Sequence, residues 1–194
     1  MRALQKLRRF AQPAPRVTEK CELCGAAIDS THQHVIDLEK RRMMCTCRAC
    51  FLLFTQVGAA GGKLRSVSER YLKLPKLEIP GDEIPVGIAF FIRDSATNLV
   101  KAFYPSPAGP VEAGITVEAW AEMIANAPAL AGMEPDVEAA LIGNSESWIV
   151  PVDACYELVG RMKRTWRGFD GGPEARGEIA GFFAGLVKVE TRFV

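Results

Sequence analysis

Residues 21–50 read CELCGAAIDSTHQHVIDLEKRRMMCTCRAC and carry five of the six cysteines of the chain. Two pairs, Cys21 with Cys24 and Cys47 with Cys50, have the Cys-x-x-Cys spacing of metal-binding turns, which aim both sulfur atoms at one point. The 22 residues between Cys24 and Cys47 leave room for a hairpin. The spacing therefore predicts two turns that meet around one metal ion.

Four thiolates satisfy the tetrahedral preference of zinc, and we predict that Cys21, Cys24, Cys47 and Cys50 hold one zinc ion. Tetrahedral sulfur also suits iron, so a rubredoxin-like iron site or an iron–sulfur cluster is the alternative. A site closed by four protein ligands leaves no position for a substrate, which makes the metal structural. It would stabilise a module of about forty residues that is too short for a core of its own.

A single four-ligand site does not need every candidate ligand in this stretch. Three more remain, namely Cys45, His34 and His32. Cys45 either replaces Cys47, or supports a ligand from outside the first coordination sphere, or belongs to a second metal. A His-x-His pair on a strand points both rings to the same side. These rings would add a ligand or orient a thiolate through a hydrogen bond.

The composition excludes several classes of protein. The chain has 194 residues, a net charge of +1 and 48% hydrophobic residues, which suits one full domain with a small appendage. This charge balance argues against a nucleic-acid binder. No apolar run reaches the roughly 18 residues of a membrane span, and the basic N-terminus is not followed by the apolar segment of a secretion signal. We expect a cytoplasmic protein, where clustered cysteines bind metal more often than they form disulfides.

Three parts of the chain differ in pattern. Residues 1–20 form a basic arm, residues 21–80 a zinc-ribbon-like metal-binding module, and residues 81–194 an α+β domain. The predicted fold class is α+β, with a β-hairpin or sheet packed against about three helices in the second part. Pro75, Pro80 and Gly81 mark the boundary between the last two parts.

The α+β domain has clear local signals. The apolar runs in residues 84–105 predict a hairpin, and the proline-rich residues 105–110 predict a loop. Thr116 is the expected N-cap of a helix over residues 117–126. Short strands are expected near residues 137–142 and 148–152, the first of which also suits a short helix. Two helices should follow, one capped by Asp153 and one over residues 174–188.

No catalytic constellation stands out in the second part. Cys155 lies near the start of a predicted helix, which lowers a thiol pKa, but no histidine follows His34 in the chain. We therefore expect a buried core thiol. Asp153 and Asp170 are carboxylates that suit acid–base work, although helix capping and surface solvation explain them more simply.

Several segments resemble a bacterial family of uncharacterised proteins encoded beside nickel–iron hydrogenase genes. The matching segments are residues 21–25 (CELCG), 32–34 (HQH), 45–51 (CTCRACF), 84–91 (IPVGIAFF), 102–109 (AFYPSPAG), 150–160 (VPVDACYELVG) and 166–172 (WRGFDGG). The resemblance implies a cytoplasmic accessory role in hydrogenase assembly or electron supply. It implies no chemistry, because gene neighbourhood is an association.

Three functions follow as expectations. The first is a zinc-binding accessory or assembly protein that acts by protein–protein interaction on a hydrogenase subunit or its maturation machinery. The second is an electron-transfer protein with iron or an iron–sulfur cluster in the cysteine cluster. The third is an enzyme with a site in the C-terminal domain.

Overall fold

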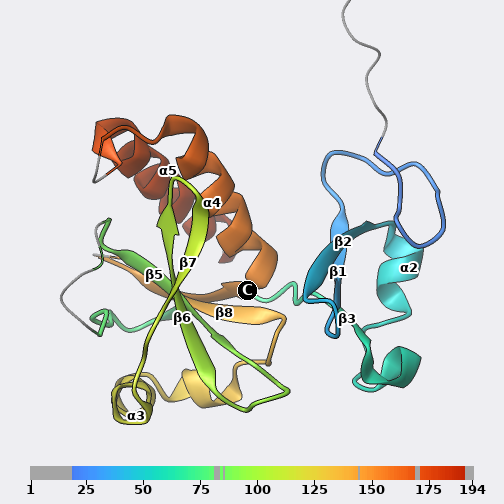
Figure 1. Ribbon diagram of the computed structural model, residues 1–194, viewed down its shortest axis with the longest axis horizontal. Coiled ribbons are helices and arrows are strands. Elements are labelled where there is room, and N and C mark those ends of the chain that lie inside the picture. Colours follow the sequence, from blue (N-terminus) through green and yellow to red (C-terminus); the bar gives the residue numbers. More distant parts are fainter. Residues whose placement is uncertain (1–18, 81–83, 85, 144, 169–170, 191–194) are drawn as a thin grey trace, which may run out of the picture.

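The computed structural model describes residues 19–80, 84, 86–143, 145–168 and 171–190, which form two lobes built around two separate sheets (Figure 1). The predicted basic arm lies almost wholly outside these residues. The smaller lobe contains residues 19–66 and is called the N-terminal module below. The larger lobe contains the described residues from 72 to 190 and is called the C-terminal domain. The α+β fold class predicted from the sequence is confirmed.

The N-terminal module has a three-stranded antiparallel sheet with the order β2-β1-β3. Its elements are β1 (Gln33–Asp37), β2 (Arg42–Thr46), α2 (Arg48–Leu52), the short 3-10 helix η1 (Ala59–Gly62) and β3 (Leu64–Ser66). Val35 and Met44 are paired across β1 and β2 and face a small core that Phe51 of α2 completes. Only five hydrophobic side chains are buried among the described residues of this module, and two of them are cysteines, so apolar packing contributes little to its stability.

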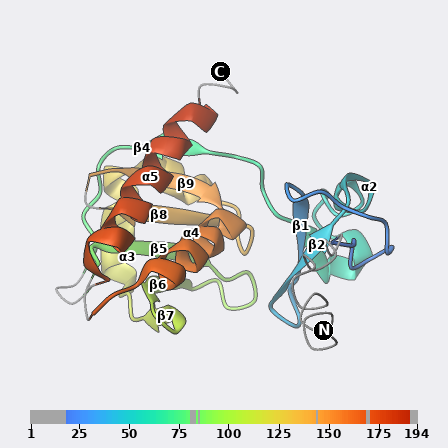
Figure 2. The same cartoon turned by 90° about the horizontal axis from the view of Figure 1, so that it is seen from above.

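The C-terminal domain has a six-stranded antiparallel sheet with the order β4-β9-β8-β5-β6-β7. Its strands are β4 (Leu72–Leu74), β5 (Ile88–Arg93), β6 (Val100–Ser106), β7 (Gly109–Ala113), β8 (Glu138–Gly143) and β9 (Ser147–Pro151). Helices α4 (Val152–Thr165) and α5 (Gly172–Glu190) cover one face of the sheet, and α3 (Val117–Asn126) with the 3-10 helix η2 (Pro128–Gly132) covers the other (Figures 1 and 2). Among the described residues, no helix combines the length and hydropathy that crossing a membrane requires.

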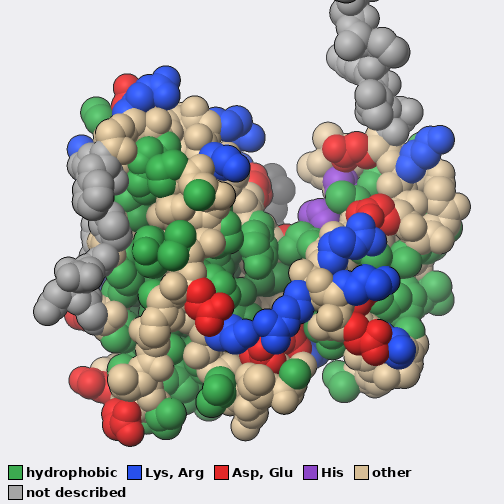
Figure 3. Space-filling model, viewed as in Figure 1, with side chains coloured by type: hydrophobic (Ala, Val, Ile, Leu, Met, Phe, Trp, Pro, Cys, Tyr) green, Lys and Arg blue, Asp and Glu red, His purple; other side chains and the backbone are tan. Residues whose placement is uncertain are grey.

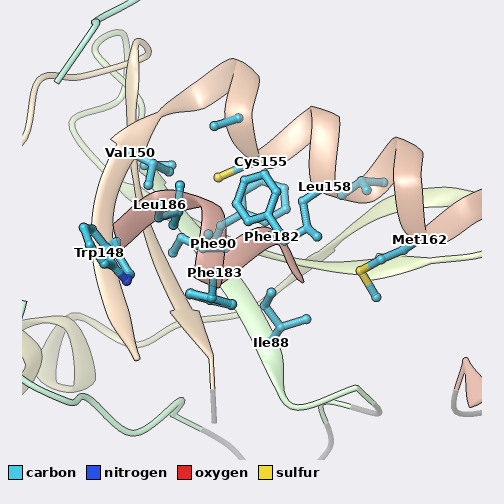
Figure 4. Packing of buried hydrophobic residues seen from close by; sticks show 14 of the residues in the cluster. Ile88, Phe90, Trp148, Val150, Cys155, Leu158, Met162, Phe182, Phe183 and Leu186 are labelled. Carbon is cyan, nitrogen blue, oxygen red and sulfur yellow. The ribbon is translucent and has the colours of Figure 1, made fainter. Parts of the chain in front are cut away.

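Both faces of the central strands are buried, which explains their nearly continuous apolar sequences. On β5, Phe90 packs under α4 and α5, whereas its neighbour Phe91 faces α3 and η2. The core under α4 and α5 also contains Trp148 and Cys155, both fully buried (Figure 4). The alternation of side chains along each strand therefore divides one sheet between two cores.

Several local predictions are confirmed. The hairpin expected over residues 84–105 is β5 and β6, and the strands expected near residues 137–142 and 148–152 are β8 and β9. The helix over residues 117–126 is α3, whose N-cap Thr116 accepts a hydrogen bond from the backbone N–H of Ala119.

Two local predictions differ from the structure. Residues 105–110 form a tight hairpin that joins β6 to β7. Pro105 and Pro110 lie opposite each other on these two strands, next to the turn. Asp153 does not cap α4, since Pro151 occupies the N-cap position and Asp153 lies in the first turn. β4 precedes the boundary predicted at residue 80 yet pairs with β9. The division into three parts nonetheless stays a prediction.

A buried carboxylate joins the connection between the two sheets to the C-terminal domain. Glu138, only 1% exposed at the start of β8, accepts hydrogen bonds from Ser68 and Arg70 in the connecting segment and from the backbone N–H of Glu134. Arg70 binds both carboxylate oxygens, which is the strong two-pronged geometry for this pair. The carboxylate therefore fixes the chain where it passes from one lobe to the other.

Replacing Arg70 with alanine should destabilise the C-terminal domain by about 2–3 kcal/mol, because it leaves the buried charge of Glu138 without its counterion. The free energy is measured by urea unfolding followed by tryptophan fluorescence, since all three tryptophans of the chain lie in this domain. Lys63→Ala is the control, because Lys63 and Glu39 form an exposed pair whose loss should change stability by no more than about 0.5 kcal/mol. Equal effects of the two substitutions would contradict this account.

Candidate metal centre

The first cysteine turn is built by residues 21–26. The backbone N–H of Gly25 donates to the carbonyl of Cys21, and the N–H of Cys21 donates to the carbonyl of Ala26, each at 2.8 Å. Gly25 has φ of 75°, a left-handed conformation that glycine adopts without steric cost. This backbone turns back on itself and places Cys21 and Cys24 on the same side.

The second cysteine turn begins α2. Cys47 occupies the N-cap position, and its carbonyl accepts the N–H of Phe51 at 2.9 Å. Cys50 lies within the helix and is buried. Glu22 links the two turns, because its N–H donates to the carbonyl of Cys45 and its carboxylate accepts the N–H of Cys45, both at 2.9 Å.

The structure brings together the four cysteines that the spacing predicts as ligands. The sulfur atoms of Cys21, Cys24, Cys47 and Cys50, called the four-cysteine cluster, all lie within 4.8 Å of one another and form no disulfide. The Sγ atoms of Cys24 and Cys47 are 3.7 Å apart. Zinc–sulfur bonds of 2.3 Å in a tetrahedron give an edge of about 3.8 Å, so this separation matches a single bound ion. The cluster could hold a metal ion, and the assignment of the four ligands stays a prediction.

The thiols of this cluster differ in acidity. Burial alone would raise the pKa of Cys21, but hydrogen bonds from the backbone of Cys47, Cys24 and Leu23 lower it to about 6. Burial and the neighbouring cysteines raise the pKa of Cys50 to about 12. One thiolate therefore forms readily, and its charge opposes ionisation of the next, which is the situation that a bound cation relieves.

The surplus ligand types form a second group. One donor atom from each of His32, His34 and Cys45 lies within 4.8 Å of the others, and we call these residues the histidine–cysteine cluster. His34 and Cys45 lie opposite each other on β1 and β2, and the two imidazole rings are 4.9 Å apart between centroids. Burial, followed by the charges of Glu22 and Glu19, raises the pKa of Cys45.

A residue of the C-terminal domain completes the surroundings of this second cluster. Asp153 on α4 places its Oδ2 atom 2.8 Å from Nδ1 of His34, although the two residues are 119 positions apart. The sequence offered no signal for this contact, because Asp153 suited a helix cap equally well.

A cleft of about 700 Å³ lies between the two lobes. Its apolar walls come from the sheet of the N-terminal module and from β5, β6 and α4, and its rim carries charged side chains. The lining residues are Ile36, Leu38, Arg41, Arg42, Met43, Ile92, Asp94, Ser95, Ala96, Lys101, Phe103, Glu112, Asp136, Val152 and Tyr156. The histidine side chains, shown in purple in Figure 3, lie on the edge of the N-terminal module that faces the hollow between the lobes.

The residues considered for chemistry in the C-terminal domain do not gather in this cleft. Cys155 is fully buried between α4 and the sheet, and burial raises its pKa far above the ordinary value, which agrees with an inert core thiol. Asp153 is engaged with His34. Asp170 lies outside the described residues.

The fold and the four-cysteine cluster define an α+β protein with a zinc-ribbon-like N-terminal module. The chain belongs to a family of unknown function, DUF5947, whose model matches residues 20–190. This range contains both cysteine turns, both histidines and nearly all of the C-terminal domain. No curated protein and no solved structure matches the chain.

Replacing Cys24 or Cys47 with serine should remove the metal and unfold the N-terminal module, because the module has little core and structural metal binding supplies folding energy. Metal content is measured by elemental analysis, and the module is followed by amide hydrogen exchange of β1 to β3. Tryptophan fluorescence should show the C-terminal domain still folded. Cys155→Ala is the matched control and should keep its metal. A Cys47→Ser variant with full metal content would show that the ligand set is wrong.

Proposed function

We propose that this protein is a zinc-binding accessory protein that acts by protein–protein interaction, with the four-cysteine cluster as a structural centre. The observation that carries the proposal is the convergence of four cysteine sulfurs within 4.8 Å in a module with few buried hydrophobic side chains. Four protein ligands close a tetrahedral ion to substrate, so the ion stabilises a surface instead of performing chemistry. We place the protein in the cytoplasm, where its cysteines stay reduced.

The spacing of the sulfur atoms favours a single ion over an iron–sulfur cluster. A cluster places several iron and sulfide atoms between its cysteines, so that cysteine sulfurs on different irons lie farther apart than those around one ion, whereas all four sulfurs here lie within 4.8 Å of one another. The 3.7 Å between Cys24 and Cys47 is close to the edge of a tetrahedron around one ion. Zinc is the proposed ion, and a single rubredoxin-like iron is the alternative.

The surface of the N-terminal module supports an interaction role. Large hydrophobic side chains are exposed at Leu23 in the first cysteine turn, at Leu52 and Leu53 around the end of α2, and at Val57. Leu53 is 68% exposed and Val57 is 82% exposed. Figure 3 shows hydrophobic side chains along the outer edge of this lobe. Exposed apolar side chains beside a rigid metal centre suit a protein-binding surface.

The proposed partner is a nickel–iron hydrogenase subunit or its maturation machinery. This part of the proposal rests on the resemblance of seven segments of the sequence to proteins encoded beside hydrogenase genes. The match to the family of unknown function carries no link to those genes. The partner therefore needs a direct binding test.

The protein purified without oxygen should be colourless and contain zinc and no iron. Elemental analysis measures the metals, and an absorption spectrum recorded before and after reduction detects iron bound to thiolates. One iron per chain with visible absorbance that bleaches on reduction would replace this proposal with the electron-transfer function.

The double substitution of Leu52 and Leu53 with aspartate should weaken partner binding about tenfold or more, because it places charges on the exposed apolar surface. Affinity is measured by calorimetry with purified nickel–iron hydrogenase subunits and their precursors. Metal content should not change, since both side chains point away from the core. Leu99→Asp is the matched control, because Leu99 is 57% exposed but lies in the C-terminal domain. Absence of binding to all of these proteins would contradict the proposed partner.

A further inference from the structure

The histidine–cysteine cluster has the donor atoms of a second metal site. Strand pairing sets His34 directly opposite Cys45, so their side chains leave the sheet on the same face as close neighbours. His32 lies two residues before His34, and the two rings meet edge to face. Imidazole and thiolate together suit zinc and other divalent transition metals.

Hydrogen bonds orient both rings toward a shared point. Nδ1 of His32 lies 2.9 Å from the carbonyl oxygen of Asp29, so this nitrogen carries the proton and Nε2 holds the lone pair. Nδ1 of His34 lies 2.8 Å from the carboxylate of Asp153, which leaves Nε2 as the metal-binding nitrogen there too. A carboxylate or carbonyl behind a metal-binding histidine is the usual arrangement in metal sites.

One atom of the cluster has no partner. Nε2 of His32 is buried, and none of the residues that the structure describes forms a hydrogen bond with it. A buried nitrogen lone pair without a donor costs free energy of about 1–3 kcal/mol. A cation beside Cys45 and His34 would satisfy it. The missing partner of this nitrogen is an observation independent of the spacing of the donor atoms. Both observations point to a bound metal ion.

We propose that His32, His34 and Cys45 bind a second divalent transition-metal ion through the two Nε2 atoms and the sulfur, and that Asp153 positions His34 for this ion. Around zinc these donors would lie about 3.4–3.6 Å apart, a small contraction from their present separation of at most 4.8 Å. The site is separate from the four-cysteine cluster and does not depend on the proposed function.

Three protein ligands leave the fourth tetrahedral position to water or to an exchangeable ligand. Ile36 and Met43 follow the alternation of His34 and Cys45 on β1 and β2, and both line the cleft between the lobes. The second site therefore lies at the end of the cleft, and His34 is 23% exposed there. It differs from the closed four-cysteine centre in this accessible position.

The test is equilibrium dialysis of the full chain, without oxygen, against a series of buffered free Zn²⁺ concentrations. The wild type should bind two zinc ions per chain, and the double variant His32→Ala with Cys45→Ser should bind one. The chain has only two histidines, so background binding to other imidazoles does not arise. Cys155→Ala is the control and should bind two ions.

Asp153→Asn tests the positioning role. Because Asp153 lies in the C-terminal domain, the substitution does not directly alter the folding of the N-terminal module. The substitution should lower the affinity of the second site for zinc by about 10–100-fold and leave the affinity of the first site unchanged. Glu157→Gln, one turn further along α4, makes the same chemical change at an exposed carboxylate and should have no effect. Unchanged affinity of Asp153→Asn would overturn the role of Asp153.

Three results would overturn the second site, and each differs from a failure of the proposed function. One zinc ion in the wild type at every free Zn²⁺ concentration would leave the four-cysteine centre as the sole site. Two ions that persist in the double variant would place the second ion elsewhere. If Cys45→Ser alone removed the tightest ion, Cys45 would belong to the four-cysteine centre.

Discussion

Convergence of the two cysteine turns is the constraint on which the N-terminal module depends. Apolar packing does not supply it, because Val35, Met44 and Phe51 form a core too small to hold two chain segments in place. Backbone hydrogen bonds instead shape each cysteine turn, and Glu22 links the first turn to the strand that leads into the second. Hydrogen bonds from the backbone of Cys47, Cys24 and Leu23 lower the pKa of Cys21, while burial and the neighbouring cysteines raise the pKa of Cys50, so a cation at the centre would favour ionisation of all four thiols.

The two lobes meet through directional polar contacts and enclose an open cleft. Glu138 holds the connecting segment, Arg65 contacts Glu134 and the carbonyl of Pro135, and His34 contacts Asp153. Directional contacts of this kind fix an orientation, but they do not exclude water as a broad apolar interface does. This explains how a cleft of about 700 Å³ persists between the two sheets.

The sequence predicted the parts whose signals are local. The N-cap Thr116 and the apolar runs of β5 and β6 depend on neighbouring residues, and both predictions agree with the structure. The Cys-x-x-Cys spacing is equally local, and the four sulfur atoms that it selects lie together, while their role as metal ligands stays a prediction. The prediction of a loop at residues 105–110 was wrong, because proline, which usually interrupts strands, is tolerated at the end of an edge hairpin.

Contacts between distant segments had no such signal. Asp153 has the sequence context of a helix cap, and nothing in that context separates a cap from a partner of His34 across the lobes. The cleft is equally hidden, because its lining residues come from stretches that lie far apart in the chain. Sequence therefore identified the candidate ligands but not the carboxylate that contacts one of them.

The structure separates Cys45 from Cys47 although only one residue lies between them. Thr46 is fully buried, and its hydroxyl donates to the carbonyl of Gln33, which holds β2 against β1 to its last residue. Up to that point the strand alternation directs Cys45 toward His34 and the cleft. After it the chain turns into α2, and Cys47 faces the other three cysteines. Exchanging Cys45 for Cys47 in the four-cysteine cluster would require breaking this end of the sheet, so the two clusters draw on different cysteines although these are nearly adjacent in the chain.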